Sequence, residues 1–115
     1  MSEADGAVVI TGASRGIGAA AAIAFARGGG RVFALSRSGA PPADAPANVT
    51  ALACDVAEPA SVGRAFEAIH ADGAHVRVLV NNAGAIEPIG KVGAVDVVAW
   101  AKVVRANLEG ALYCI

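Results

Sequence analysis

Residues 11–18 read Thr-Gly-Ala-Ser-Arg-Gly-Ile-Gly, and they separate a short apolar run from a stretch of strong helix formers. The apolar run, residues 7–10, shows no alternation, which favours a strand buried on both faces of a parallel sheet. The helix formers extend from Arg15 to Arg27, and the glycines at 28–30 then end the helix. A glycine-rich turn between a buried strand and a helix is therefore the segment that decides the fold.

Each glycine of this turn has a separate physical use. Gly12 permits a tight turn, Gly16 lets the backbone approach a diphosphate without a Cβ in the way, and Gly18 lets the helix pack on the sheet. The free N–H groups and the positive end of the helix dipole then face the phosphates. Glycines also mark ordinary turns, so the strand–turn–helix context is what favours phosphate binding. The predicted phosphate-binding residues are Gly12, Ser14, Arg15, Gly16, Ile17 and Gly18.

The rest of the chain continues the alternation of strands and helices. Further strands are predicted over residues 31–36, 49–54 and 76–80, with helices beginning near Pro59 and, after an Asp96 N-cap, near Val97. Residues 38–48 contain three prolines and are predicted to form a surface loop. This order predicts an α/β fold, a Rossmann-type doubly wound parallel sheet with strand order 3-2-1-4. We expect residues 1–115 to form one such domain, truncated after the fourth strand and its following helix.

Composition narrows the class of protein. The 115 residues suffice for one domain, and 56% hydrophobic residues with only 4% aromatic indicate a core of small side chains. Lys plus Arg (9) nearly balance Asp plus Glu (10), which argues against nucleic-acid or anionic-membrane partners. The acidic N-terminus and the absence of a long apolar run predict a cytoplasmic protein. Cys54 and Cys114 lack metal-ligand or CxxC spacing, so we expect buried free thiols and no metal site.

The pattern T-G-x-x-x-G-x-G, followed later by Asn81-Asn82-Ala83-Gly84, resembles the short-chain dehydrogenase/reductase family. Asp55-Val56 and Asn107 also fall where that family has them, so the resemblance covers residues 7–115. It implies an oxidoreductase that transfers hydride between a nicotinamide and a small-molecule carbonyl or secondary alcohol in the complete protein. It also implies a homo-oligomer. The stretch from Ile86 to Trp100 looks most like the branch containing sepiapterin and benzil reductases.

Residues at the end of the second predicted strand indicate which cofactor is preferred. NAD-binding folds place an acid there to accept hydrogen bonds from the ribose, but this chain has Ser36-Arg37-Ser38. Arg15 can reach the same region, and the planar guanidinium group of arginine presents donors that match the oxygens of a phosphate. The chain is therefore predicted to prefer NADP(H) over NAD(H), the correlation that the resembling family also shows. The alternative is that Arg37 is a solvated loop charge.

The resemblance also implies roles for residues farther along the chain. Asp55 would meet the adenine amino group with Val56 beside the ring, although Asp55 could equally cap the following helix. Residues 82–84 (Asn82, Ala83 and Gly84) would line the cofactor near its ribose. Asn107 is the candidate catalytic residue, because the family's counterpart bends this helix and holds a water in the proton relay to a lysine.

The residues around Asn107 also permit a structural role in place of a catalytic one. Its apolar neighbours predict that its side chain points into the protein, where a core asparagine bonded to backbone is the alternative. The predicted buried side of this helix comprises Trp100, Val103, Val104, Leu108, Ala111, Leu112 and Ile115.

The remaining catalytic groups of the family lie beyond this helix. They are a serine and a Tyr-x-x-x-Lys pair, and Tyr113, the single tyrosine, lies too early to take that role. The 115-residue chain alone is therefore predicted to be inactive, and the open edge of its fourth strand predicts poor solubility or dependence on a partner. One alternative is a non-catalytic dinucleotide-binding module. Another is a reading frame without a stable product.

Overall fold

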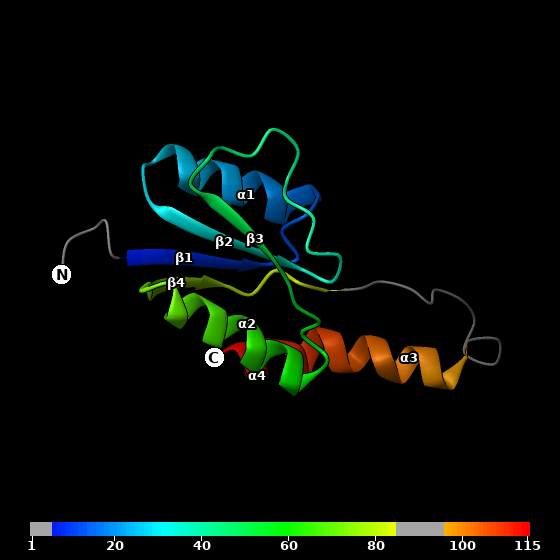
Figure 1. Ribbon diagram of the computed structural model, residues 1–115. Helices are drawn as coiled ribbons and strands as arrows, with labels where there is room; N and C mark the ends of the chain where they lie inside the picture. Colours follow the sequence, from blue (N-terminus) through cyan, green and yellow to red (C-terminus); the bar gives the residue numbers. More distant parts are fainter. Residues whose placement is uncertain (1–5, 85–95) are drawn as a thin grey trace.

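A four-stranded parallel sheet forms the centre of the molecule, seen in a computed structural model that describes residues 6–84 and 96–115 (Figure 1). The strands are β1 (Gly6–Thr11), β2 (Arg31–Ser36), β3 (Val49–Ala53) and β4 (His75–Val80). Their order is β3-β2-β1-β4, and every neighbouring pair is parallel. The predicted Rossmann-type topology and strand order are confirmed.

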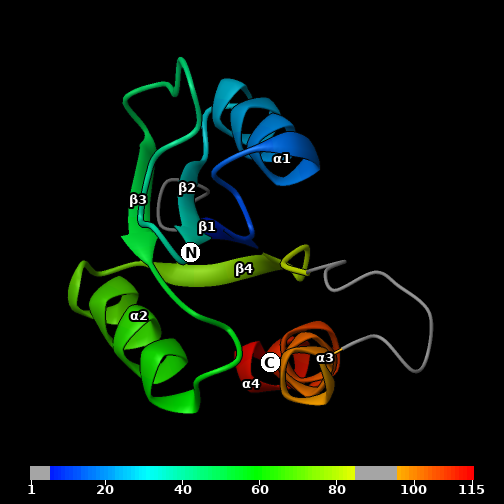
Figure 2. The ribbon, with the colours of Figure 1, turned by 90° about the vertical axis from the view of Figure 1, so that its right-hand side faces the viewer.

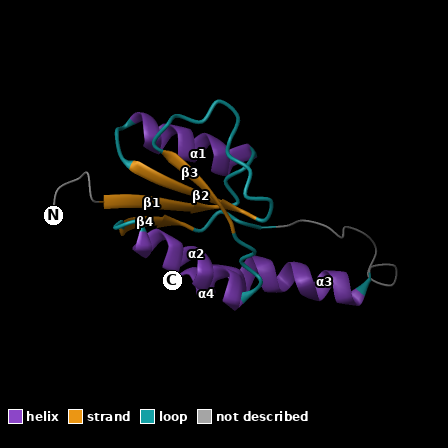
Figure 3. Cartoon of the chain, viewed as in Figure 1, coloured by secondary structure: helices purple, strands orange, loops and turns teal. Residues whose placement is uncertain are grey.

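Helices cover both faces of this sheet. They are α1 (Gly16–Arg27), α2 (Pro59–Ala71), α3 (Val97–Val104) and α4 (Gly110–Cys114), with a π-helical segment, η2 (Arg105–Glu109), between the last two. Figure 2 shows α1 on one face, with α2 and the α3–α4 stretch on the other. The connection from β2 to β3 contains no helix, as its prolines predict (Figure 3).

Alternate residues of β1 and β2 divide the core into two clusters. Phe33 and Leu35 pack toward α2, whereas Val32 and Ala34 pack toward α1. Buried alanines form the inner side of α1, and small side chains of this kind let a helix axis come close to the sheet. The sheet therefore holds the end of β1 and the start of α1 firmly beside each other.

Two predicted helix ends are confirmed in detail. Gly29, just after α1, has a φ of +95°, a conformation that favours glycine and ends the helix. At the start of α3, the Asp96 carboxylate accepts hydrogen bonds from the backbone N–H groups of Val98 (2.9 Å) and Ala99 (3.5 Å). The local signals in the sequence thus fixed where these helices begin and end.

Much of the apolar side of the last helical stretch is exposed, which corrects the prediction that it is buried. Val103 and Ala111 are half-buried, and the side chain of Trp100 lies outside the described part of the chain. Leu108 is 70% and Ile115 89% exposed, and Val104 and Leu112 are exposed as well. The described part of this stretch buries only Gly110 and Cys114, which pack toward α2 and the segment after β3. Helical periodicity correctly grouped the apolar residues on one side, but it carries no information about what covers that side.

Candidate functional site

The glycine turn between β1 and α1 adopts a conformation that glycine favours. Gly12 and Gly16 have φ values of +63° and +62°, in the left-handed region. A Cβ on Gly12 would lie 2.9 Å from the Cα of Ala83, whereas a Cβ on Gly16 would meet nothing within 4 Å. Gly12 is thus enclosed by the neighbouring loop, and the backbone at Gly16 borders open space where a ligand can approach.

Gly18 brings the first turn of α1 against the turn that precedes it. A Cβ at this position would overlap the carbonyl oxygen of Gly12 and lie 2.6 Å from the side-chain nitrogen of Asn82. The overlap with backbone cannot be relieved by a rotamer change. The contact therefore requires glycine, as the sequence predicts.

The N-terminus of α1 has backbone N–H groups available for an anion. The N-cap residue, Arg15, is extended (φ −156°, ψ 170°), and its side chain makes no capping hydrogen bond. The first turn contains no acidic residue, and Ile17 is 80% exposed. Uncapped amides at the positive end of a helix dipole suit a phosphate group.

A hydrogen-bonded loop after β4 holds the glycine turn in place. The Thr11 hydroxyl oxygen, in a residue that is 1% exposed, accepts hydrogen bonds from the backbone N–H groups of Asn82 (3.0 Å) and Ala83 (2.9 Å). The Asn82 side-chain amide donates to the carbonyl oxygens of Thr11 and Gly12, each at 3.2 Å. Thr11 is absent from the site residues that the sequence predicts; the available signal was a threonine ending an otherwise apolar strand.

The loop after β2 lies beside the same turn, because the backbone N–H of Ala13 donates to the carbonyl oxygen of Leu35 at 3.0 Å. Ser36 is buried, and its hydroxyl accepts a hydrogen bond from the N–H of Gly39 (3.1 Å). Ser38 is exposed, and its hydroxyl accepts from the N–H of Ala40 (3.2 Å). Of the two serines, Ser38 is the one that faces solvent.

Two arginines supply positive charge to this region. Arg15 and Arg37 are both exposed, and neither forms an ion pair with any residue in the described part of the chain. Both guanidinium groups therefore keep their full charge and their hydrogen-bond donors for a ligand.

Asp55 stabilises a turn before α2. Its Oδ1 accepts a hydrogen bond from the backbone N–H of Ala57 (3.0 Å), while its own N–H donates to the Ser61 hydroxyl (2.9 Å). The N-cap of α2 is Glu58, so Asp55 precedes the helix without capping it. Val56 is buried against Gly110, where a Cβ would lie 2.7 Å from a Val56 methyl carbon.

Asn107 lies in the π-helical segment η2, beside the loop after β4. Its side-chain oxygen is 3.1 Å from the position that a Cβ on Gly84 would occupy. The residue is exposed, which corrects the prediction that it points into the protein. Val104 and Leu108 are exposed as well, so no described element covers the side of the helix on which Asn107 was expected to be buried.

Tyr113 has an environment unlike that of an acid/base tyrosine. Its hydroxyl donates to Glu109 Oε2 at 3.0 Å, and this hydrogen bond, with a smaller effect of burial, raises the pKa of Tyr113. A tyrosine that exchanges protons near neutral pH needs a lowered pKa. The structure thus gives no support to a catalytic role for Tyr113.

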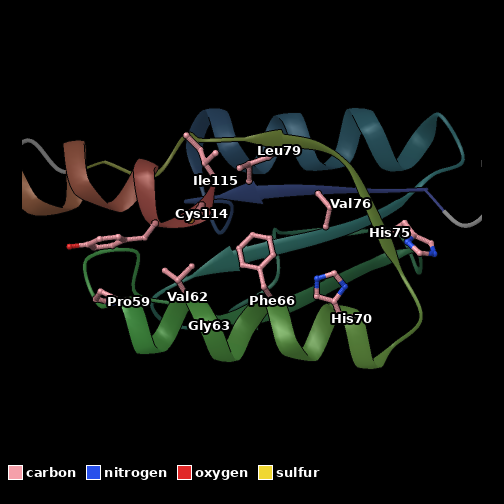
Figure 4. Close-up of a pocket in the computed structure, with 11 residues that line it drawn as sticks. Pro59, Val62, Gly63, Phe66, His70, His75, Val76, Leu79, Cys114 and Ile115 are labelled. Carbon is pink, nitrogen blue, oxygen red and sulfur yellow. The ribbon is translucent and has the colours of Figure 1, made fainter.

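A separate groove lies on the opposite face of the sheet from α1. Its volume is about 710 Å³, and it lies between α2, β4 and α4 (Figure 4). Phe66, Val76 and Leu79 line it, with His70 and His75 at one end and Cys114 at the other. None of its lining residues belongs to the glycine turn or to the loop after β4. The groove is therefore distinct from the anion seat, the name used here for the glycine turn and the uncapped N-terminus of α1.

Other classes of site find no support in residues 6–84 and 96–115. Over these ranges no three His, Cys, Asp or Glu side chains are grouped so that they could hold a metal ion. Within the same ranges, no helix has the length and apolar character needed to span a bilayer.

An anion seat at the carboxyl end of parallel strands, with charged loops on the neighbouring strands, defines a dinucleotide-binding α/β protein. The short chain dehydrogenase family model matches residues 6–115. The chain belongs to this family. The narrower resemblance to sepiapterin and benzil reductases depends largely on residues 85–95, which lie outside the described residues.

Known proteins similar to this chain include several dehydrogenases and reductases. The D-threitol dehydrogenase of Mycolicibacterium smegmatis is 37% identical over 116 residues, covering 92% of this chain and 44% of that protein. The 3-oxoacyl-[acyl-carrier-protein] reductase MabA of Mycobacterium bovis is 36% identical over 104 residues, covering 90% of this chain and 40% of that protein. The solved 3-ketoacyl-(acyl-carrier-protein) reductase of Brucella melitensis, complexed with NADH, superposes with a TM-score of 0.87 at 29% identity, covering 98% and 48%. The chain thus spans less than half the length of these relatives.

Proposed function

We propose that this chain is the NADP(H)-binding part of an oxidoreductase that interconverts a small-molecule carbonyl and the corresponding alcohol. The observation that carries the proposal is the uncapped N-terminus of α1 beside an arginine-bearing loop that contains no acid at the end of β2. The serine, tyrosine and lysine of hydride-transfer chemistry would belong to a longer protein, as the partial coverage of the relatives suggests.

The residues of the turn fit a diphosphate. Gly16 leaves the backbone open on the side where a ligand would approach, and a diphosphate there would accept hydrogen bonds from the first N–H groups of α1. Ser14 is half-buried in this turn, and Ile17 is exposed at the start of the helix. The bonds between Thr11 and Asn82 keep this seat rigid, so that little ordering is required when the ligand binds.

The preference for a 2′-phosphate would come from Arg15, Arg37 and Ser38. Two exposed guanidinium groups without acidic partners in the described chain favour a phosphate dianion. Ser36 contributes mainly by shaping the loop, because its buried hydroxyl already accepts the hydrogen bond from Gly39. A ribose without the phosphate would leave the two positive charges uncompensated.

The remaining cofactor contacts would come from loops at the same edge of the sheet. Asp55 has a second carboxylate oxygen available for an adenine amino group, with Val56 beside the ring. The 82–84 segment would lie along the nicotinamide ribose, and Asn107, next to Gly84, would position a water for proton transfer. The nicotinamide, when bound, supplies the hydride chemistry, and these residues hold and orient it.

The cofactor preference is tested by titrating the purified chain with NADPH and with NADH, following ligand fluorescence. Arg37→Asp is expected to weaken NADPH binding by about tenfold or more and to change NADH binding far less, because charge-assisted bonds are lost and a like charge is introduced. Arg64→Asp is the matched control, since Arg64 is exposed on α2. An NADPH-to-NADH affinity ratio that Arg37→Asp leaves unchanged would refute the assignment.

For the 115-residue chain alone we propose cofactor binding without turnover. Tyr113 is engaged with Glu109, and its raised pKa disfavours proton transfer. The test is to mix the chain with NADPH and a panel of aldehydes and ketones and to follow the absorbance of the reduced nicotinamide. Binding without absorbance loss is the expected result, whereas carbonyl-dependent loss would show that the chain carries its own acid/base group.

A further inference from the structure

Cys54 and Cys114 belong to one buried cluster although they come from distant parts of the chain. Cys54 follows β3 and is 3% exposed, and Cys114 ends α4 and is 6% exposed. Both are free thiols. Neither belongs to the proposed cofactor seat, so the cluster presents two nucleophilic groups that the proposed function does not use.

The contact between Gly110 and Val56 relates the positions of the two cysteines. Gly110 packs on Val56 so closely that a Cβ there would lie 3.0 Å from the Val56 carbonyl oxygen. The last helical stretch runs antiparallel to the strands (Figure 1). Moving from Gly110 to Cys114 covers about 6 Å of helix, and the two residues from Val56 back to Cys54 span at most about 6–7 Å. The two steps are of similar length, and both cysteines belong to the same buried cluster.

Two further observations support this proximity. The charge that Cys54 would carry as a thiolate acts on Cys114, adding to the effect of burial on its pKa. Cys114 also lines the groove between α2 and β4 (Figure 4).

We propose that Cys54 and Cys114 form a reversible intramolecular disulfide that fastens α4 to the segment after β3. With a glutathione disulfide as oxidant, the Cys114 thiolate attacks one of its sulfurs, and the S–S bond breaks to release one glutathione thiol. The Cys54 thiolate then attacks the sulfur of Cys114 in the mixed disulfide and releases the second glutathione. The two cysteines lose two electrons and two protons, and the glutathione disulfide is reduced to two thiols.

The test is to equilibrate the 115-residue chain with glutathione redox buffers, quench it with acid and locate the products by peptide mass mapping. The wild-type chain is expected to give a Cys54–Cys114 disulfide, whereas Cys54→Ser is expected to stop at a glutathione adduct on Cys114. Adducts alone in the wild-type chain, or disulfide-linked dimers, would overturn the proposal.

A second measurement does not depend on how well the variants fold. The equilibrium constant for disulfide formation is compared between native buffer and concentrated urea. A disulfide that fits the folded chain is expected to favour the native buffer by roughly thirtyfold to a thousandfold, the equivalent of about 2–4 kcal/mol of stabilisation. A ratio near one, or one that favours urea, would show that the folded geometry does not accommodate the bond.

Discussion

Thr11 and Asn82, 71 residues apart in the chain, are joined by two hydrogen bonds, both donated by Asn82. The Thr11 hydroxyl oxygen accepts the backbone N–H of Asn82, and the Asn82 side chain donates to the backbone carbonyl of Thr11. The pair connects the end of β1 to the end of β4. The position of the glycine turn is therefore fixed by tertiary hydrogen bonds as well as by its own conformation.

Thr11→Val is expected to lower the free energy of unfolding by about 2–4 kcal/mol. Valine keeps the shape of threonine but leaves the N–H groups of Asn82 and Ala83 without their acceptor. Urea unfolding followed by circular dichroism measures the loss. Thr50→Val, on the exposed side of β3, is the matched control and should change stability by less than about 0.5 kcal/mol. Equal effects of the two substitutions would contradict the role given to the Thr11 hydroxyl.

Gly18→Ala and Gly63→Ala are expected to have opposite effects on stability. Both glycines are helical, but a Cβ at Gly18 overlaps the carbonyl oxygen of Gly12, while a Cβ at Gly63 meets nothing within 4 Å. Gly63→Ala should stabilise the chain by about 0.5–1 kcal/mol, because alanine is the better helix former. Gly18→Ala should destabilise it and weaken NADPH binding, since the start of α1 must shift. Thermal unfolding and cofactor titration of both variants check this, and a stabilised Gly18→Ala would contradict the geometry.

The stability of the chain is expected to fall between about pH 9 and pH 11 because of Cys114. Burial, and then the proximity of Cys54, raise the pKa of the Cys114 thiol from 9.0 to about 11. Below pH 9 the thiol is protonated in the folded and the unfolded chain, so its contribution is fully present. As the pH rises toward 11 the unfolded chain loses this proton first, and stability on the order of 2 kcal/mol is lost.

The measurement for this prediction is urea unfolding over that pH range, under reducing conditions, for the wild-type chain and Cys114→Ala. The variant should show a shallower decline. Its remaining slope includes Tyr113, whose pKa is raised by the hydrogen bond to Glu109, and Cys54, whose pKa is raised by burial. Identical slopes would mean that the Cys114 thiol titrates normally.

The outer edge of β4 is expected to promote self-association of the isolated chain. In the described sheet β4 pairs only with β1, and Val78 on this strand is 39% exposed. Val78→Lys should reduce association, because a charged side chain disfavours pairing along an exposed edge. Thr50→Lys places the same charge on β3 at the opposite edge and controls for net charge. Analytical ultracentrifugation compares the variants, and equal association by both would place the contact elsewhere.

Local patterns in the sequence were sufficient to predict most of the fold. The strand over residues 31–36 has the predicted bounds, and the fourth strand begins one residue earlier than predicted, at His75. Uninterrupted apolar runs identify strands buried in a parallel sheet, and glycine and proline signals limit the helices. Gly12 and Gly18 were predictable as well, because few other residues fit a turn of that shape.

The tertiary details were not predictable from local patterns. The acceptor role of Thr11 depends on where β4 ends, far along the chain. Asn107, Val104 and Leu108 are exposed because no described element covers their side of the helix, and a local period does not reveal this. The buried hydroxyl of Ser36 bonds within its own loop, so Ser38 takes the solvent-facing position between the two predicted serines. These results depend on hydrogen bonds and packing that the periodicity of helices and strands does not describe.

The link from Thr11 to Asn82 also has a consequence for the order of events during synthesis. The glycine turn leaves the ribosome before its anchoring partners at 82 and 83, which lie 71 and 72 residues after Thr11. Contacts between such distant segments require closure of a long loop, which slows their formation. A nascent chain that ends before residues 82 and 83 would contain the whole glycine motif and still bind nucleotide weakly. We therefore expect cofactor binding to follow the docking of β4.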